Sequence, residues 1–179
     1  TTSWGVSTRL IGGMIMTHAD DDGLIVPPRV APTQVAILPV TPKEDSRAQV
    51  LEACKALSKE INECTAFDLP VRVEMDDRDL RGGEKYWQWV KKGVPLTVEI
   101  GPRDLENGTV FVGRRDLGGK REGMKREEFI SSLEDTLVAI QKNLFTKAQD
   151  FQKENTREID KREELYEYFT AKNSSKPEI

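Results

Sequence analysis

Short apolar runs of β-forming residues alternate with helical patterns between residues 34 and 100, and this alternation limits the folds open to the chain. The runs Gln34–Val40, Val71–Met75 and Leu96–Ile100 have the length and composition of strands. A strand–helix–strand–helix–strand order is typical of parallel crossovers, whose helices cover the faces of a sheet. We therefore predict an α/β fold with a mixed, mostly parallel sheet flanked by helices.

Two helices are predicted between these strands. The first opens at Thr41 or Ser46, and the second runs from Glu84 to Lys92 and is closed by Gly93. The first carries apolar residues at helical spacing: Val50, Ala53, Cys54, Leu57, Ile61 and Cys64. Because its cysteines have no CxxC spacing and no His nearby, we expect reduced core residues and no metal site.

The strand Thr109–Gly113 follows a connection of only a few residues, which favours an antiparallel neighbour. Residues 120–124 are predicted to form a short edge strand. A long amphipathic helix should then extend from Arg126 to Phe151.

Three parts are predicted along the chain: residues 1–32, residues 33–151 and residues 152–179. In the first part, the helix Arg9–Thr17 is apolar almost all round, which is typical of a buried core helix. Gly23–Val26 could form a short strand. The third part is charge-rich and helical, and its end, Asn173–Ile179, should be disordered.

The charge of the chain restricts its partners. A net charge of −4 argues against a protein that coats nucleic acid non-specifically, but it allows a local basic face for one RNA. No apolar run reaches the roughly 18 residues of a membrane span, so no membrane partner is expected.

Arg9 is the first candidate functional residue. A guanidinium beside the amides at a helix start makes a good phosphate site. The alternative is a structural ion pair with Asp20 or Asp22.

Two further candidates lie where strands end. The segment Asp76–Arg81 precedes Gly82-Gly83 and the aromatic residues Tyr86, Trp87 and Trp89, which could stack on bases. The alternative is that Trp87 or Trp89 packs the helix on the sheet.

The other strand-end segment is Gly101–Asp104, together with Arg114–Asp116. Arg103 and Asp104 present donors and an acceptor side by side, which suits a guanine edge. The alternatives are that the two side chains pair with each other and that the segment is a solvated turn. No catalytic residue is predicted, since His18 has no neighbouring nucleophile and no phosphate loop or GxSxG motif is present.

Three separated segments resemble one family in the same order along the chain. Ser3–Pro32 resembles motif 3 and its following segment in prolyl-tRNA synthetase, a class II aminoacyl-tRNA synthetase. Gly93–Asp116 resembles the centre of that enzyme's anticodon-binding domain, and Leu144–Phe151 resembles the helix beyond it. The form resembled is the archaeal- and eukaryote-like one. The resemblance implies an anticodon-binding domain of class II type, preceded by a motif 3 remnant of the catalytic domain.

The resemblance also implies roles for individual residues. Ser7 and Arg9 would contact ATP, and Ser3, Trp4 and Gly5 would line the aminoacyl-adenylate pocket. In the sheet domain, four residues would face the anticodon: Arg103, Asp104, Glu99 and Arg78. Val90 and Thr97 stand where some relatives place a charged side chain near the anticodon.

The implied function is part of a proline–tRNA ligase, a cytoplasmic enzyme of protein biosynthesis that uses ATP and Mg²⁺ to attach L-proline to its tRNA. The family's motifs 1 and 2 are absent here, so the isolated chain should be inactive. The full enzyme would be a homodimer through its catalytic half. Alternatives are a non-catalytic, synthetase-like RNA-binding module or accessory subunit, and a small-molecule-binding α/β domain.

Overall fold

The computed structural model describes residues 1–41 and 44–170 of the chain. It divides into two compact units, residues 1–148 and residues 149–179. The first unit contains the sheet. The second begins within the last turns of the long helix α6 (Leu133–Glu154).

A five-stranded sheet organises the first unit, in the order β4-β1-β5-β6-β7. The central strand β1 is parallel to both β4 and β5, whereas β6 is antiparallel to β5 and β7. Four of the five strands therefore run in one direction. This confirms the mixed, mostly parallel sheet and the antiparallel placement of β6. The strands are β1 (Val35–Pro39), β4 (Val73–Met75), β5 (Leu96–Ile100), β6 (Thr109–Arg114) and β7 (Arg121–Lys125).

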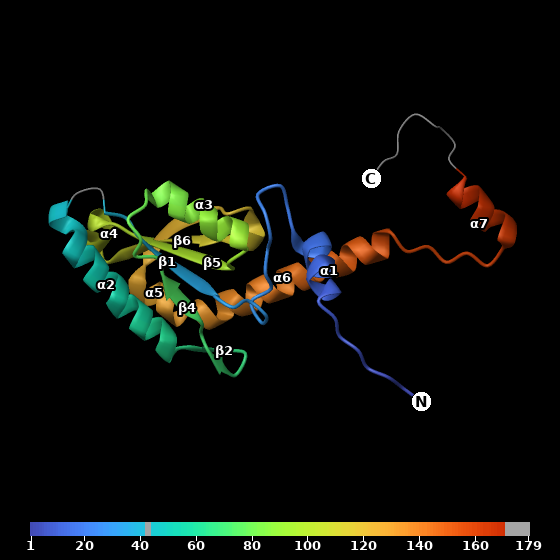
Figure 1. Cartoon of the computed structure of the whole chain (residues 1–179), viewed down its shortest axis with the longest axis horizontal. Coiled ribbons are helices and arrows are strands. Elements are labelled where there is room, and N and C mark those ends of the chain that lie inside the picture. Colours follow the sequence, from blue (N-terminus) through green and yellow to red (C-terminus); the bar gives the residue numbers. More distant parts are fainter. Residues whose placement is uncertain (42–43, 171–179) are drawn as a thin grey trace. The chain divides into compact units, whose positions relative to one another are not determined.

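Helices cover both faces of the sheet (Figure 1). On β1, the side chains of Val35 and Ile37 belong to the larger core cluster with α2, α5 and α6, whereas those of Ala36 and Leu38 pack with α3. Alternate residues of a strand point to opposite faces, so a fully apolar strand needs cover on both sides. The helices are α2 (Glu44–Glu63), α3 (Gly82–Lys92), α4 (Pro102–Asn107), α5 (Arg126–Ser131) and α6 (Leu133–Glu154).

The long C-terminal helix of the prediction is interrupted. α5 ends at Ser131 and α6 begins at Leu133. The Ser132 hydroxyl donates to the carbonyl of Glu128 at 2.8 Å, and a serine that bonds back to its own helix competes with helix continuation. The apolar positions on both sides of the break, including Phe129 and Leu137, are nevertheless buried as their spacing predicts.

A small hairpin was not predicted. β2 (Thr65–Ala66) and β3 (Leu69–Pro70) are antiparallel, and both turn residues have positive φ, 56° for Phe67 and 64° for Asp68. Phe is an unusual residue at positive φ, and no Gly or Asn marks this turn, so the local pattern did not predict the hairpin. Because the hairpin occupies residues 65–70, the following strand starts at Val73 instead of Val71.

The strand predicted at Gly23–Val26 is wrong. Only an isolated bridge forms, between Asp20 and Gly23. The chain then passes close to the end of α3, where the Val26 amide donates to the Gly93 carbonyl at 2.9 Å. Gly93 has φ 76°, and a Cβ there would lie 2.6 Å from the carbonyl oxygen of Leu24, so only glycine fits this approach.

The helix at the start of the chain, α1 (Arg9–His18), has nearly its predicted bounds, but none of its residues is buried. Leu10, Ile11 and Met16 are exposed, so the burial predicted from its apolar composition is not found within this chain. By contrast, Ile25 and Ala31 in the following segment are buried within the first unit.

The second unit contains the end of α6 and α7 (Arg162–Phe169). An ion pair joins Arg157 to Glu164 at 2.8 Å, and the aromatic residues of α7 remain exposed.

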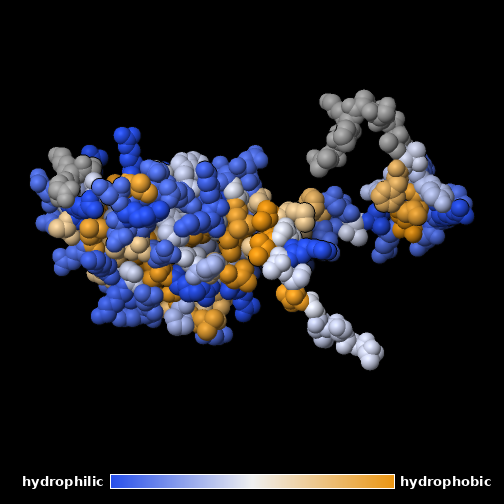
Figure 2. Space-filling view, viewed as in Figure 1, coloured by the Kyte–Doolittle hydropathy of each residue, from blue (hydrophilic) through white to orange (hydrophobic). Residues whose placement is uncertain are grey.

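The face of the molecule in Figure 2 is mostly hydrophilic, with hydrophobic side chains exposed in separate places. The predicted disordered segment Asn173–Ile179 lies outside the described residues. No helix of the described chain is long and apolar enough to cross a membrane.

Candidate nucleic-acid interface

The loops that carry the candidate RNA-binding residues meet at one edge of the sheet. Because β1, β4 and β5 are parallel, their carboxyl ends share this edge. A Cβ on Gly82 would lie 3.8 Å from Val40, and one on Gly101 would lie 3.6 Å from it. The loop after β4, with Arg78, and the loop after β5, with Arg103, therefore both border the end of β1.

Asp76 is the buried anchor of the first of these loops. Its carboxylate accepts hydrogen bonds from Nη2 of Arg78 at 2.6 Å and from Nε1 of Trp89 at 2.9 Å. Its backbone carbonyl accepts from Nζ of Lys85 at 3.1 Å. The Arg78 hydrogen bond, followed by that of Trp89, outweighs desolvation and lowers the pKa of Asp76 to about 2. These contacts fix α3 to the sheet.

This arrangement separates the two tryptophans. Trp89 is buried against β1 and bonded to Asp76, as the packing alternative predicts, whereas Trp87 is about half exposed. Arg78 is held by Asp76 through both Nε and Nη2, so this edge of its guanidinium serves the loop itself. The sequence placed Asp76 in the candidate segment Asp76–Arg81 but did not predict its role as the buried anchor, because Asp77 beside it has the same side chain.

Arg103 and Asp104 lie in a short helix, α4, which corrects the expected turn. The Asp104 carboxylate accepts from the Gly101 amide at 2.9 Å and from the Thr109 hydroxyl at 3.3 Å. Asp104 therefore closes the helix start and is not directed to the solvent beside Arg103. The Arg103 side chain is exposed, and it has no ion-pair partner in the part of the chain that the structure describes.

Glu99 belongs to a different surface, the open sheet face, which consists of Glu99, Phe111 and Arg121. These residues lie on the α3 side of β5, β6 and β7, opposite the buried Val98 and Val112. Glu99 forms an ion pair with Nη1 of Arg121. The Arg121 side chain is 38% exposed, and Phe111 is 36% exposed. Charge and an aromatic ring are thus presented together to solvent.

Aromatic rings and glycines hold Arg121 in place. Its Cζ lies 4.5 Å from the ring centroid of Tyr86 on α3 and 5.6 Å from that of Phe111. A Cβ on Gly113 would lie 2.9 Å from Cγ of Arg121, so a larger residue there would displace the arginine. The Tyr86 hydroxyl donates to the Gly119 carbonyl at 3.3 Å, and burial raises the pKa of Tyr86.

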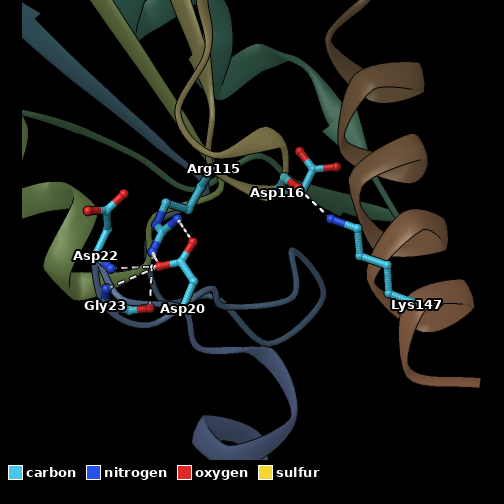
Figure 3. A network of polar contacts seen from close by, with 6 residues as sticks. All are labelled: Asp20, Asp22, Gly23, Arg115, Asp116 and Lys147. Atoms are coloured by element: carbon cyan, nitrogen blue, oxygen red, sulfur yellow. Dashed lines mark hydrogen bonds and ion pairs between the residues drawn. The ribbon is translucent and has the colours of Figure 1, made fainter. Parts of the chain in front are cut away.

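Arg115 forms a buried clamp close to the open face. Its side chain is 2% exposed, forms an ion pair with Asp20 and donates to the Gly23 carbonyl at 3.0 Å (Figure 3). The hydrogen bond from Arg115 holds the pKa of Asp20 below its usual value. Asp20 thus pairs with Arg115, and within the part of the chain that the structure describes no hydrogen bond or ion pair joins it to Arg9.

Asp116, the residue after Arg115, is also buried and forms its own set of contacts. Its carboxylate accepts from Nη2 of Arg114 at 2.9 Å and from Nδ2 of Asn143 at 2.7 Å. Nζ of Lys147, on α6, donates to its backbone carbonyl at 2.9 Å (Figure 3). The Arg114–Asp116 segment, a candidate RNA-binding turn in the sequence, therefore holds the end of β6 to α6.

The candidate ATP-site residues lie together at the start of the chain, apart from the sheet residues. Ser3, Trp4 and Gly5 are exposed in an extended segment, and Ser7 and Arg9 are exposed where α1 begins. These five residues are near one another along the chain, but the structure does not gather their side chains around a common site. Val90 and Thr97 are buried, so neither presents a side chain at the surface.

The described residues contain no group of three or more His, Cys, Asp or Glu side chains that could hold a metal ion. Cys54 is buried as predicted, and burial raises the pKa of its thiol to about 12, which makes it unreactive. Cys64 is partly buried and bonded to the Glu60 carbonyl. His18 has its pKa lowered by burial.

The fold and the sheet-edge residues define the class of this protein. Residues 34–136 match the family described as anticodon binding domain, and the chain belongs to that family. The match includes the whole five-stranded sheet and all four anticodon candidates.

Several curated relatives carry the name proline–tRNA ligase. Those of Bdellovibrio bacteriovorus and Anaeromyxobacter dehalogenans (the latter named proline–tRNA ligase 2) are each 48% identical to this chain over 99% of its length. That of Rhodopirellula baltica is 48% identical over 98% of the chain. The chain covers 36%, 35% and 34% of these proteins, respectively, so it spans about a third of their length.

Proposed function

We propose that the chain is the C-terminal part of a prolyl-tRNA synthetase and that its sheet domain binds the anticodon of the tRNA for proline. The observation that carries this proposal is the anticodon-binding family match across residues 34–136, within a chain 48% identical to proline–tRNA ligases over nearly its whole length. The archaeal- and eukaryote-like form of the enzyme is part of the proposal.

The anticodon site consists of the sheet edge and the adjoining open sheet face. Arg103 is exposed at the edge, and Glu99 and Phe111 lie on the open face. Exposed aromatic rings and forked donors suit the unstacked bases of an RNA loop. Asp104 and Arg78 support this site through the contacts that hold α4 and the loop after β4.

The first residues would contribute to the synthetase active site as part of motif 3. There, Arg9 and Ser7 would contact ATP, and Ser3, Trp4 and Gly5 would line the pocket for the prolyl-adenylate. The exposed apolar residues of α1, among them Leu10 and Met16, fit a helix that packs within a catalytic domain.

The full enzyme would activate L-proline with ATP and transfer it to its tRNA in the cytoplasm, acting as a homodimer. Mg²⁺ would neutralise phosphate charge in the activation step. The described residues include no acidic cluster for this ion, so we assign no ligand to it within them. What this chain would supply is the Arg9 guanidinium at the phosphates and the selection of the tRNA.

A binding titration tests the anticodon assignment. The chain is titrated with a tRNA that carries a proline anticodon and with the same tRNA after an anticodon swap. We expect the first to bind more tightly and Arg103→Ala to weaken its binding by about 1–3 kcal/mol if Arg103 contacts a base edge. Arg103 is the sharper choice than Asp104, because Asp104→Ala would also open α4.

The matched control is Arg29→Ala, an exposed arginine whose Cζ lies 5.3 Å from the ring centroid of Phe67, in the hairpin that precedes β4. This variant should bind as the unmodified chain does. Equal affinity for the two tRNAs would refute the anticodon assignment.

A further inference from the structure

We propose that Arg121 is a specificity-determining residue of the RNA site, whose guanidinium donates to O6 and N7 of an anticodon guanine, and that Glu99 positions it. This inference rests on the proposed function. It adds a residue that neither the sequence nor the family match singled out.

The course of the Arg121 side chain shows that its guanidinium is held in a defined place. Arg121 is level with Gly113 on β6, which is level with Thr97 on β5. Its guanidinium nevertheless pairs with Glu99, two residues further along β5. The side chain therefore runs over the surface of β6, across the space that the missing side chain of Gly113 leaves free.

Neighbouring side chains fix the position of the Arg121 guanidinium, but not all of its N–H donors form hydrogen bonds. The rings of Tyr86 and Phe111 lie near it, and Glu99 accepts from Nη1. Among the described residues, no hydrogen bond of Nε or Nη2 of Arg121 is found. A planar group with a fixed orientation and free donors loses little freedom when it binds a base.

The neighbouring arginines lack this combination. Arg115 is buried and uses both terminal nitrogens, and Arg114 gives Nε and Nη2 to Asp116. Arg78 gives the same two nitrogens to Asp76. Among the described arginines on the sheet, Arg121 is the one that combines unused guanidinium N–H donors with partial exposure beside an exposed aromatic ring, Phe111.

The chemistry of this fork selects guanine. Two parallel N–H donors match the O6 and N7 acceptors of guanine, which no other base offers together. Proline codons begin with two cytosines, so the anticodons that pair with them contain two guanines. Phe111 lies beside Arg121 on the next strand, where its exposed ring can stack on the same or the adjacent base.

Glu99 acts through Arg121. Its side chain is only 17% exposed, and its Oε1 accepts from Nη1. Glu99→Gln should therefore weaken guanine selection while leaving the charge of Arg121 in place.

The experiment uses the 179-residue chain and anticodon stem-loop RNAs, with 7-deazaguanine replacing each anticodon guanine in turn. This base lacks N7 and keeps the Watson–Crick edge. We expect Arg121→Ala to weaken binding of the unmodified stem-loop about 10- to 100-fold. One of the two 7-deaza positions should weaken binding to the unmodified chain and have no effect on the Arg121→Ala variant.

Two further variants separate charge from geometry. Arg121→Lys should keep the salt dependence of binding but lose the discrimination between guanine and 7-deazaguanine, since an ammonium group has no fork. Arg126→Ala is the matched control, because Arg126 is 36% exposed and pairs with Glu60 at 2.9 Å on the opposite side of the sheet. It should bind like the unmodified chain.

The results distinguish this inference from the function on which it rests. If the unmodified chain binds an anticodon-swapped stem-loop equally well, the proposed function fails. If it prefers the proline anticodon but the 7-deaza penalties are the same with and without Arg121, the role of Arg121 is overturned and the proposed function stands.

Discussion

Two arginine–carboxylate pairs, whose arginines directly follow β6 and begin β7 and are six positions apart, differ in nearly every physical respect. Arg115 is buried, and both of its terminal nitrogens are bonded to Asp20, with Gly23 as a further acceptor. Arg121 is partly exposed and bonded to Glu99 through one nitrogen. The Arg115 pair holds residues 20–23 in place, whereas the Arg121 pair leaves N–H donors available to a ligand. Residue type alone does not distinguish these roles, whereas burial and unused donors do.

The Asp76 cluster belongs with the first kind. Its carboxylate is buried and accepts from Arg78 and Trp89, so it fixes α3 in the way that the Arg115 clamp fixes residues 20–23. The comparison can be tested by removing one charge from each pair. The buried pairs should affect stability, and the open pair should affect RNA binding.

The largest stability loss is expected for Asp20→Ala. It leaves the buried Arg115 guanidinium with the Gly23 carbonyl as its remaining described acceptor. Loss of one partner costs about 3–5 kcal/mol when both charges are buried; because the Asp20 side chain is 37% exposed, we expect a loss of about 2–3 kcal/mol. Urea unfolding followed by circular dichroism measures the change. Asp21→Ala, at the exposed neighbouring position, is the control and should change stability by less than about 0.5 kcal/mol. Equal stability of the two variants would show that the clamp is not structural.

A smaller effect is expected from acid. The pKa of Asp76 is lowered to about 2 from 3.8, so its ionised form stabilises the folded chain above the unfolded pKa. This contribution, on the order of 2 kcal/mol, should be lost as the pH falls from about 4 through about 2. Asp76→Asn should remove this part of the pH dependence, measured by urea unfolding at a series of pH values. Asp79→Asn, at an exposed aspartate, should retain it; the same pH dependence in both variants would contradict the assignment.

The smallest stability change is expected at the open sheet face. Because the Glu99–Arg121 pair is partly exposed, Arg121→Ala should reduce the free energy of unfolding by less than about 1 kcal/mol. The same urea series measures it. A loss as large as that of Asp20→Ala would place Arg121 with the structural anchors and remove the contrast between the two pairs.

Much of the fold followed from local patterns. The strands β1 and β5 and the helix α3 lie where period and capping residues predicted them, and Gly93 ends α3 with a left-handed conformation. The hairpin at residues 65–70 was missed because Phe67 is unusual at positive φ and no Gly or Asn marks the turn. The break at Ser132 was missed because the apolar spacing continues through it.

The candidate site was predicted in part. The sheet edge with Arg103 and Arg78 followed from the rule that ligands bind at the carboxyl ends of parallel strands. The roles of Asp104 and Arg114–Asp116 as structural contacts were not foreseen, because each depends on an acceptor or donor in another element. Arg121 could have been noticed from Gly113, since a glycine inside a strand often marks a close approach.

By itself, the sequence determined the α/β alternation, the anticodon-binding resemblance and the apolar character of α1. These depend on the order of residues within single segments. Only the tertiary structure decided which charged side chains are buried and which remain available, and that no residue of α1 is fully buried within this chain. The physical reason is that pairing and burial depend on residues far apart in sequence, such as Arg115 and Asp20, which are separated by 95 positions.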